Sequence, residues 1–497
     1  MSIDLKSILS TSLLLAAILL VGRVFGLLRE TLLAASFGTS NLSDVAILMM
    51  TLPDFLVGIL LAGGLSSALV PELAKLQPPQ RLSLALKFGA LIFAVFLVIS
   101  LVAGFNAEII VTYMSAGTYY SEQTLSDFRI SFFAFAFVAA TGVAASYLNV
   151  SGKFISPNVG SIIFNGSVCV YFVAFVQNED PVFWLAIFLV IAVLLRFIFV
   201  FMFIVPDLIK IRIIPTRINP RLFSRFAYGI IGFSILAGSP IIFRSIYAAY
   251  GVGYLTWFNF AQKLFDLPLG LIIAPFSIVL LPKLASLFEK SIVLFNKFIY
   301  DGLISVFAFS LSSTVIGFIF IDMITNLLFN YGKMTVSDID RIQEIAGILL
   351  VALPFCALGQ IAASGLNAQG RAGRFMMNGL IALLTVLGIY FILSLSIEGL
   401  DQKVILILFV LFHAILGFAN LYSLFSKRLP QWGTLRDVLR LVIVVGGIGL
   451  PTFFIKDWYM EDGSTVQQML LMVSSAALMA WFNRSVFTRL QQYQIET

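Results

Sequence analysis

Two arginines and a glutamate lie inside the first long apolar stretch of the chain. The sequence reads "GRVFGLLRE" from Gly22 to Glu30 and contains Arg23 and Arg29. A guanidinium group at the centre of a membrane span costs roughly 2.5–3.5 kcal/mol, so it needs a cavity, a partner or a nearby interface. Two guanidinium groups beside a water-filled cleft bind phosphate or pyrophosphate well, because their donors match two phosphate oxygens. The stretch therefore indicates an anion site within a membrane.

The spacing of these residues leaves two interpretations open. On a straight helix Glu30 shares a face with the first arginine, whereas Arg29 lies about 120° away. Both arginines reach one cavity only if the helix bends, and Gly22 and Gly26 permit either a bend or a close contact with another helix. The alternative is a structural ion-pair network with Glu30 and Asp44, and both interpretations can hold together.

Further polar residues fall in other apolar stretches. Lys263 lies in "FAQKLFDLP", in the second half of the chain, where it can face the same cavity. The secondary cavity candidates are Asp54, Ser67, Gln262 and Asp266. Three more arginines, Arg129, Arg196 and Arg244, are expected near span ends, where a long side chain can reach the membrane surface.

The chain shows no catalytic constellation. Its single histidine, His413, lies in an apolar span, which argues against a histidine-rich metal site. The phosphate-loop pattern G-x-x-x-x-G-K-[ST] does not occur, so ATP hydrolysis by that route is not expected. We therefore expect no enzyme activity, no metal and no cofactor, with energy supplied by a gradient, the membrane potential or a partner.

Composition predicts that membrane-spanning helices position these residues. The chain has 497 residues, of which 60% are hydrophobic and 11% are charged, and its mean hydropathy is +1.02. Apolar runs of about 20 residues recur throughout, each long enough to cross a bilayer. Such continuous runs do not fit the alternating strands of a membrane barrel. We predict an all-α polytopic membrane protein of about fourteen transmembrane helices.

The distribution of charge predicts the orientation of the chain. Basic residues such as Lys75, Arg81 and Lys153 follow the even-numbered spans, whereas loops such as "SAGTYYSEQ" and "SIEGLDQK" on the other side are acidic or neutral. This positive-inside pattern places both termini in the cytoplasm. It also accounts for the net charge of +6, so we expect no nucleic-acid partner.

The sequence repeats itself. "AASYLNVSGK" (Ala144–Lys153) recurs as "AASGLNAQGR" (Ala362–Arg371), and "VPELAKL" (Val70–Leu76) is echoed by "LPKLASL" (Leu281–Leu287). The echoes keep their order along the chain. They predict two halves of the same orientation, and parallel repeats of this kind are typical of transporters whose substrate path runs between the halves.

The repeat sets the expected domain boundaries. We expect two pseudo-symmetric six-helix lobes, 1–213 and 214–428, followed by a C-terminal helix pair at 429–497.

Several stretches together resemble a known family. They are "GRVFGLLRE", "LSDVAILMMTLPDFL", "SSALVPELAK", "YLNVSGKFISPN", "AQKLFDLPLG", "LLPKLAS" and "LFNYGKMT". In this order they resemble the MurJ (MviN) lipid II flippases of the multidrug/oligosaccharidyl-lipid/polysaccharide exporter superfamily. The resemblance implies fourteen spans, two lobes and a C-terminal helix pair that forms a lipid-facing groove. It also implies a location in the bacterial inner membrane, and we expect a monomer.

The resemblance implies a cargo and a site. The cargo would be an undecaprenyl-pyrophosphate-linked saccharide, lipid II in the first place, moved across the membrane by alternating access. The essential arginines of the family fall on Arg23 and Arg29, its essential aspartate on Asp44, and an acidic position on Glu30. Lys263 replaces an arginine of the second lobe.

Departures from the family pattern keep other cargoes open. Val57 and Gly58 stand where the family often has basic residues, and Ala62 replaces a glutamate. A flippase for an exopolysaccharide or O-antigen lipid carrier is the alternative. A cation-coupled drug exporter of the same superfamily fits less well, because it needs an acidic cavity and this one is basic.

Overall fold

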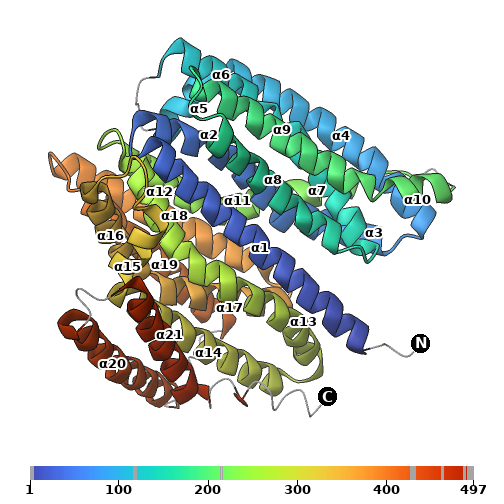
Figure 1. The fold of residues 1–497 in the computed structure, drawn as a ribbon. Coiled ribbons are helices and arrows are strands. Elements are labelled where there is room, and N and C mark those ends of the chain that lie inside the picture. Colours follow the sequence, from blue (N-terminus) through green and yellow to red (C-terminus); the bar gives the residue numbers. More distant parts are fainter. Residues whose placement is uncertain are drawn as a thin grey trace. The chain divides into compact units, whose positions relative to one another are not determined.

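The computed structural model describes residues 5–115, 120–212, 214, 216–425, 433–459, 464–484 and 488–489. These residues form helices and no strand (Figure 1). The chain folds as two compact units, the first comprising Met1–Thr256 with Tyr331–Met334, and the second Trp257–Asn330 with Thr335–Thr497. The prediction of an all-α fold is confirmed.

The first unit contains eleven α-helices and one π-helix. They are α1 (Leu5–Phe37), α2 (Asn41–Gly58), η1 (Ile59–Leu69), α3 (Val70–Ala74), α4 (Pro78–Phe105), α5 (Ala107–Met114), α6 (Glu122–Phe132), α7 (Ala134–Val150), α8 (Ile155–Ala174), α9 (Pro181–Met202), α10 (Val205–Lys210) and α11 (Pro220–Ala248). Within this unit α8 packs against both α1 and α9, and α11 packs along η1.

The second unit begins within α12 (Tyr254–Pro268), directly after Thr256. It continues through η2 (Leu269–Ile273), α13 (Ala274–Lys290), α14 (Ile292–Ile319), α15 (Ile321–Phe329), α16 (Val336–Leu350), α17 (Leu353–Ala368), α18 (Ala372–Ser396), α19 (Lys403–Leu424), α20 (Gly433–Tyr459) and α21 (Thr465–Phe482). The last two helices pack against α14. The lobe boundaries proposed from the repeat, 1–213, 214–428 and 429–497, stay a prediction.

The number of long apolar helices agrees with the composition. Ten described helices are long and apolar enough to cross a membrane, and the pair α16 and α17, bent by 44°, forms an eleventh span if it is counted as one. The helices α1 and α11 and the continuous helical run from α12 to α13 account for the remaining predicted spans. The described helices are therefore compatible with the count of about fourteen spans expected from the sequence.

Two π-helical segments occupy corresponding places in the repeat. Here η1 precedes the "VPELAKL" echo and η2 precedes the "LPKLASL" echo. Pro268 ends α12 immediately before η2, and a proline lacks the N–H that the α-helical pattern needs at that point. Since π-helical residues make up well under about 1% of protein structure, their recurrence supports a structural repeat.

The other pair of echoes ends in the same kind of turn. Gly152 and Gly370 both have positive φ, at 79° and 70°. The backbone N–H of Lys153 donates to Leu148 O, and that of Arg371 donates to Leu366 O, each at 2.8 Å. This is the Schellman ending of a helix, in which glycine supplies the left-handed residue. The repeated sequence motif thus specifies a repeated backbone turn.

A short segment from later in the chain belongs to the first unit. The backbone N–H of Lys333 donates to Ala35 O at 2.9 Å, which ties Tyr331–Met334 to the last turn of α1. Gly332, at φ 62°, lies directly against Ala35 O, where a side chain would find no room.

Candidate functional site

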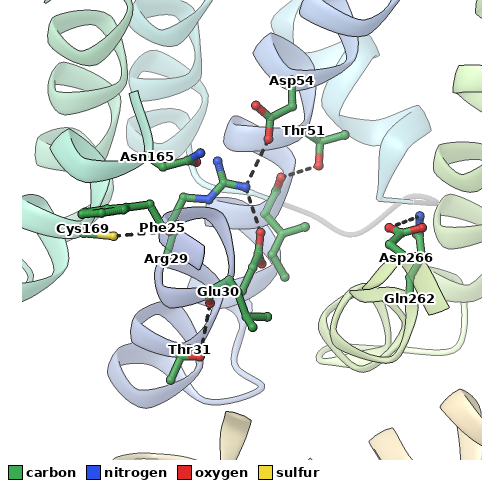
Figure 2. A network of polar contacts seen from close by, with 12 residues as sticks. Phe25, Arg29, Glu30, Thr31, Thr51, Asp54, Asn165, Cys169, Gln262 and Asp266 are labelled. Atoms are coloured by element: carbon green, nitrogen blue, oxygen red, sulfur yellow. Dashed lines mark hydrogen bonds and ion pairs between the residues drawn. The ribbon is translucent and has the colours of Figure 1, made fainter. Parts of the chain in front are cut away.

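The first arginine motif is positioned by close packing of α1 on α8. Gly22 faces Ser161, and a Cβ atom at Gly22 would lie 2.8 Å from the Ser161 hydroxyl. Gly26, one turn later, faces Asn165, whose Nδ2 donates to the Gly22 carbonyl at 3.5 Å. Cys169 Sγ donates to another backbone carbonyl of α1 at 3.8 Å (Figure 2). The two glycines therefore serve a close helix contact, one of the two roles predicted for them.

Arg29 is held in a buried ion-pair network. Its Nη2 donates to Glu30 Oε1 at 2.9 Å and to Asp54 Oδ2 at 3.1 Å (Figure 2). Its guanidinium carbon lies 5.9 Å from the centroid of the Phe164 ring. Only 6% of the Arg29 side chain and 4% of the Glu30 side chain are exposed, against 46% for Asp54. Asp54 is therefore the open end of the network.

The network leaves donors of Arg29 unused. Its Nε and Nη1 atoms are buried and have no acceptor among the described residues. A buried donor without an acceptor carries its full desolvation penalty, about 1–3 kcal/mol and more for a charged group. An anion with several oxygen acceptors would satisfy these donors, and phosphate and pyrophosphate are anions of this kind.

Arg23 has different surroundings from Arg29. It lies on an exposed part of α1, next to the exposed Val24, whereas Arg29 is only 5% exposed. The sequence predicted that the two side chains point in different directions on a straight helix, and their different burial agrees with this.

Asp44 binds a helix terminus. Its carboxylate is 4% exposed and accepts hydrogen bonds from Gly253 N at 2.8 Å, Thr256 N at 3.0 Å and Thr256 Oγ1 at 2.6 Å. It thus caps the first turn of α12, where free N–H groups and the helix dipole favour a negative charge. The expected pairing of Asp44 with Arg29 is replaced by the pairing of Asp54 with Arg29.

Arg244 is a buried arginine that the sequence placed near a span end. It is 5% exposed, and its Nη2 donates to Thr51 Oγ1 at 2.6 Å. The prediction that it reaches the membrane surface is therefore wrong. Arg196 is also more enclosed than predicted, because its Nε is buried. Arg129 is exposed, as expected.

The remaining predicted site residues are only partly described. Lys263, Gln262 and Asp266 lie on the part of α12 that belongs to the second unit, and Gln262 Nε2 donates to Asp266 Oδ2 at 3.4 Å (Figure 2). The side chain of Ser67 lies outside the described part of the chain. That these residues share a cavity with Arg29 stays a prediction.

Comparison with protein families decides the class of this chain. The family model described as "Lipid II flippase MurJ" matches residues 33–475. The chain belongs to the MurJ lipid II flippase family. The matched range begins after Arg23, Arg29 and Glu30, so it does not test the roles expected for them.

Individual relatives agree with the MurJ assignment. The chain is 27% identical over 359 residues to a lipid II flippase MurJ from Burkholderia cenocepacia, covering 67% of this chain and 69% of that protein. It is 23% identical over 372 residues to a probable lipid II flippase MurJ from Rickettsia prowazekii, covering 72% and 73%.

Solved structures show the same fold. A lipid II flippase MurJ in an inward closed conformation superposes with a TM-score of 0.78 at 19% identity, covering 96% of this chain and all of that one. An inward-facing multidrug resistance MATE family transporter of the MOP superfamily reaches 0.63 at 12% identity, covering 84% and 95%. The predicted resemblance to the MurJ family is confirmed, and the MATE match shows that the fold is shared more widely.

Proposed function

We propose that this MurJ-family protein is a flippase that moves a polyprenyl-pyrophosphate-linked saccharide across the bacterial inner membrane, with lipid II as its cargo. The observation that carries the proposal is the Arg29 guanidinium, which is buried within a predicted membrane span and has two nitrogen atoms without an acceptor in the described part of the chain. The names of its relatives, lipid II flippases, support the same cargo.

Pyrophosphate is the part of the cargo that needs a binding site of this kind. A pyrophosphate group bears negative charge, and a charged group is costly to place in the membrane interior. A guanidinium group offsets that cost, since it stays protonated and offers donors in a fixed fork. Asp54, being half exposed, can move aside when the phosphate arrives, while the buried Glu30 continues to hold Arg29.

We further propose that Asp44 couples this site to alternating access. Its carboxylate holds the first turn of α12, and this helix continues into the second unit immediately after Thr256. A change that releases Gly253 and Thr256 from Asp44 would free the start of α12 to move. The MurJ and MATE folds that this chain resembles are those of transporters.

We propose that a groove beside α21, the last helix of the predicted C-terminal pair, holds the polyprenyl tail. The second unit contains an apolar groove of about 270 Å³ on its surface. Among its lining residues are Leu264, Leu267 and Pro268 of α12, Ile316 of α14, and Met472 and Val473 of α21. An apolar groove beside the last helix suits an isoprenoid chain, which binds by burying apolar surface.

The proposed orientation places both termini in the cytoplasm, and we propose that the protein acts as a monomer. The distribution of Lys and Arg supports the orientation. A set of single cysteines in the loops, labelled from outside intact cells, tests it. Labelling of a cysteine placed beside Lys153 would contradict the assignment.

The cargo is tested by complementation. In cells depleted of their own lipid II flippase, the wild-type chain is expected to restore growth, and Arg29→Ala is expected to fail. Arg129→Ala, which removes an exposed arginine of the same unit, serves as the matched control and is expected to restore growth. Equal rescue by Arg29→Ala would disprove the pyrophosphate role.

A second cargo is separated by the same experiment. Val57 and Gly58 lack the basic side chains that the family often has there. The wild-type chain would then fail to restore growth in the cells depleted of lipid II flippase. It would instead restore surface polysaccharide in a mutant that lacks an O-antigen flippase. This pair of results would assign an O-antigen or exopolysaccharide lipid carrier as the cargo.

A further inference from the structure

A second arginine lies over the same face of α8 as Arg29. The Arg196 side chain crosses Gly160, where a Cβ atom would lie 3.1 Å from its Cγ and 3.3 Å from its Nε. The Arg29 guanidinium lies beside Phe164, four residues further along α8. Residues four apart share a helix face and are about 6 Å apart along the axis. The two arginines therefore approach one side of α8 at successive turns.

Arg196 is on the packed side of α9. Leu189, Val193 and Val200 are each at most 1% exposed, and Arg196 continues their spacing of three and four residues. Its Nε is buried and has no hydrogen-bond acceptor among the described residues. A guanidinium group inside a membrane span is expensive unless it pairs or performs a function, and packing alone would be served better by an apolar side chain.

Asp54 connects the two arginines electrostatically. It accepts a hydrogen bond from Arg29 at 3.1 Å, and its negative charge also acts on Arg196. The group thus has two guanidinium groups and two carboxylates, those of Asp54 and Glu30. Since Asp54 is half exposed and Glu30 is buried, departure of Asp54 would leave a net positive site with unused donors on both arginines.

We propose that Arg29 and Arg196 together form a two-guanidinium site for the pyrophosphate group, and that Asp54 is an internal anion that the phosphates displace. Each arginine would bind one of the two phosphates, so the site discriminates pyrophosphate from monophosphate. All its residues belong to the first unit. The proposal rests on the proposed flippase function for the identity of the anion, and it adds Arg196 as a residue that positions the cargo.

The test uses the purified full chain in lipid nanodiscs with farnesyl pyrophosphate and farnesyl monophosphate as probes. Arg196→Met is expected to weaken pyrophosphate binding about tenfold, the equivalent of one charge-assisted hydrogen bond, and to weaken monophosphate binding much less. Asp54→Asn is expected to strengthen pyrophosphate binding, because it removes the competing anion. Arg129→Met, which removes an exposed arginine from the same unit, is expected to leave both affinities unchanged.

The outcomes separate this inference from the proposed function. Loss of binding in Arg29→Ala with wild-type affinities in both Arg196→Met and Asp54→Asn would overturn the two-guanidinium site and leave the flippase function standing. Absence of pyrophosphate binding by the wild-type chain would instead contradict the proposed function. If Arg196→Met does not fold, Arg196→Lys decides, because lysine keeps the charge but lacks the fork of donors, so the preference for pyrophosphate over monophosphate is expected to fall. An unchanged preference in Arg196→Lys, together with wild-type pyrophosphate affinity in Asp54→Asn, would overturn the inference.

Discussion

Thr256 donates both its backbone N–H and its hydroxyl to the carboxylate of Asp44, at 3.0 and 2.6 Å. The two residues are 212 positions apart in the sequence. Thr256 is also the last residue of the first unit before the chain enters the second. One buried carboxylate on α2 therefore fixes the beginning of the helix that joins the two units.

The first prediction concerns this cap. Asp44→Asn keeps the shape of the side chain but removes its charge, so the hydrogen bonds from Gly253 and Thr256 lose their charge assistance. Loss of a helix cap costs about 1 kcal/mol, and the charge adds to this. We expect the Gly253 and Thr256 amides to exchange with deuterium at least about fivefold faster, since 1.4 kcal/mol corresponds to a factor of ten.

The neighbouring residue supplies the control for the cap. Ser43 is as buried as Asp44, but its hydroxyl has no hydrogen-bond partner among the described residues. Ser43→Ala should therefore leave exchange at the start of α12 unchanged. If Asp44→Asn and Ser43→Ala behave alike, the carboxylate does not hold the helix.

The membrane helices were predictable because their cause is local. Any continuous apolar run of the right length has to be helical in lipid, where the backbone finds no other partner. The turn after α7 also depends on local sequence, since it needs Gly152 in the left-handed conformation. The same sequence motif forms the same turn at Gly370. These features depend on a few consecutive residues.

The partner of Arg29 was not predictable, because it depends on the register of two helices. Arg29 lies about ten residues before the middle of the turn between α1 and α2, so the residue opposite it in an antiparallel pair is near position 49. Asp44 and Asp54 are each about five residues, or roughly 7.5 Å, from that level. A long arginine can reach either, and the sequence alone does not decide between them.

The environments of the arginines on α9 and α11 were predicted wrongly for a related reason. Arg196 and Arg244 lie in apolar stretches, and their distance from the span ends did not exclude contact with the membrane surface. A usable signal was present for Arg196, which shares a face with Leu189, Val193 and Val200. Arginine on an otherwise apolar face that packs inside the protein indicates a functional charge.

The second prediction concerns the buried partner of Arg29. Glu30→Gln removes the carboxylate that lies 2.9 Å from Arg29, whereas the ion pair between Arg29 and Asp54, at 3.1 Å, stays in place. Removing one member of a buried ion pair lowers the free energy of unfolding by about 3–5 kcal/mol. Because Asp54 still pairs with Arg29 in this variant, we expect a loss of stability of about 3 kcal/mol. We expect a clearly lower thermal unfolding temperature for the purified protein in detergent.

A matched variant and a double variant make the Glu30 result decisive. Glu108→Gln removes an exposed carboxylate from α5 of the same unit and should unfold like the wild type. Arg29→Met combined with Glu30→Met should regain part of the lost stability, because no buried charge is then left unpaired. An unfolding temperature of Glu30→Gln equal to that of Glu108→Gln would show that Glu30 does not stabilise the network.

The third prediction concerns the close contact between α1 and α8 that positions Arg29. Gly22 faces Ser161 so closely that a large side chain would force α1 away from α8. Gly22→Leu is expected to destabilise the protein by about 1–3 kcal/mol, the usual cost of overpacking, and to abolish rescue in the complementation assay. Gly22→Ala should be milder, since the Ser161 hydroxyl can rotate away from a single methyl group.

The same substitution at an open glycine isolates the effect of the contact. A Cβ atom at Gly104 on α4 meets no atom within 4 Å, so Gly104→Leu adds the same side chain without a clash and should support growth. Ser161→Gly makes room opposite Gly22 and should restore the stability lost in Gly22→Ala. If Gly22→Leu instead supports growth as well as Gly104→Leu, tight packing of α1 on α8 is not what positions Arg29, and the orientation of the arginine must come from its carboxylate partners alone.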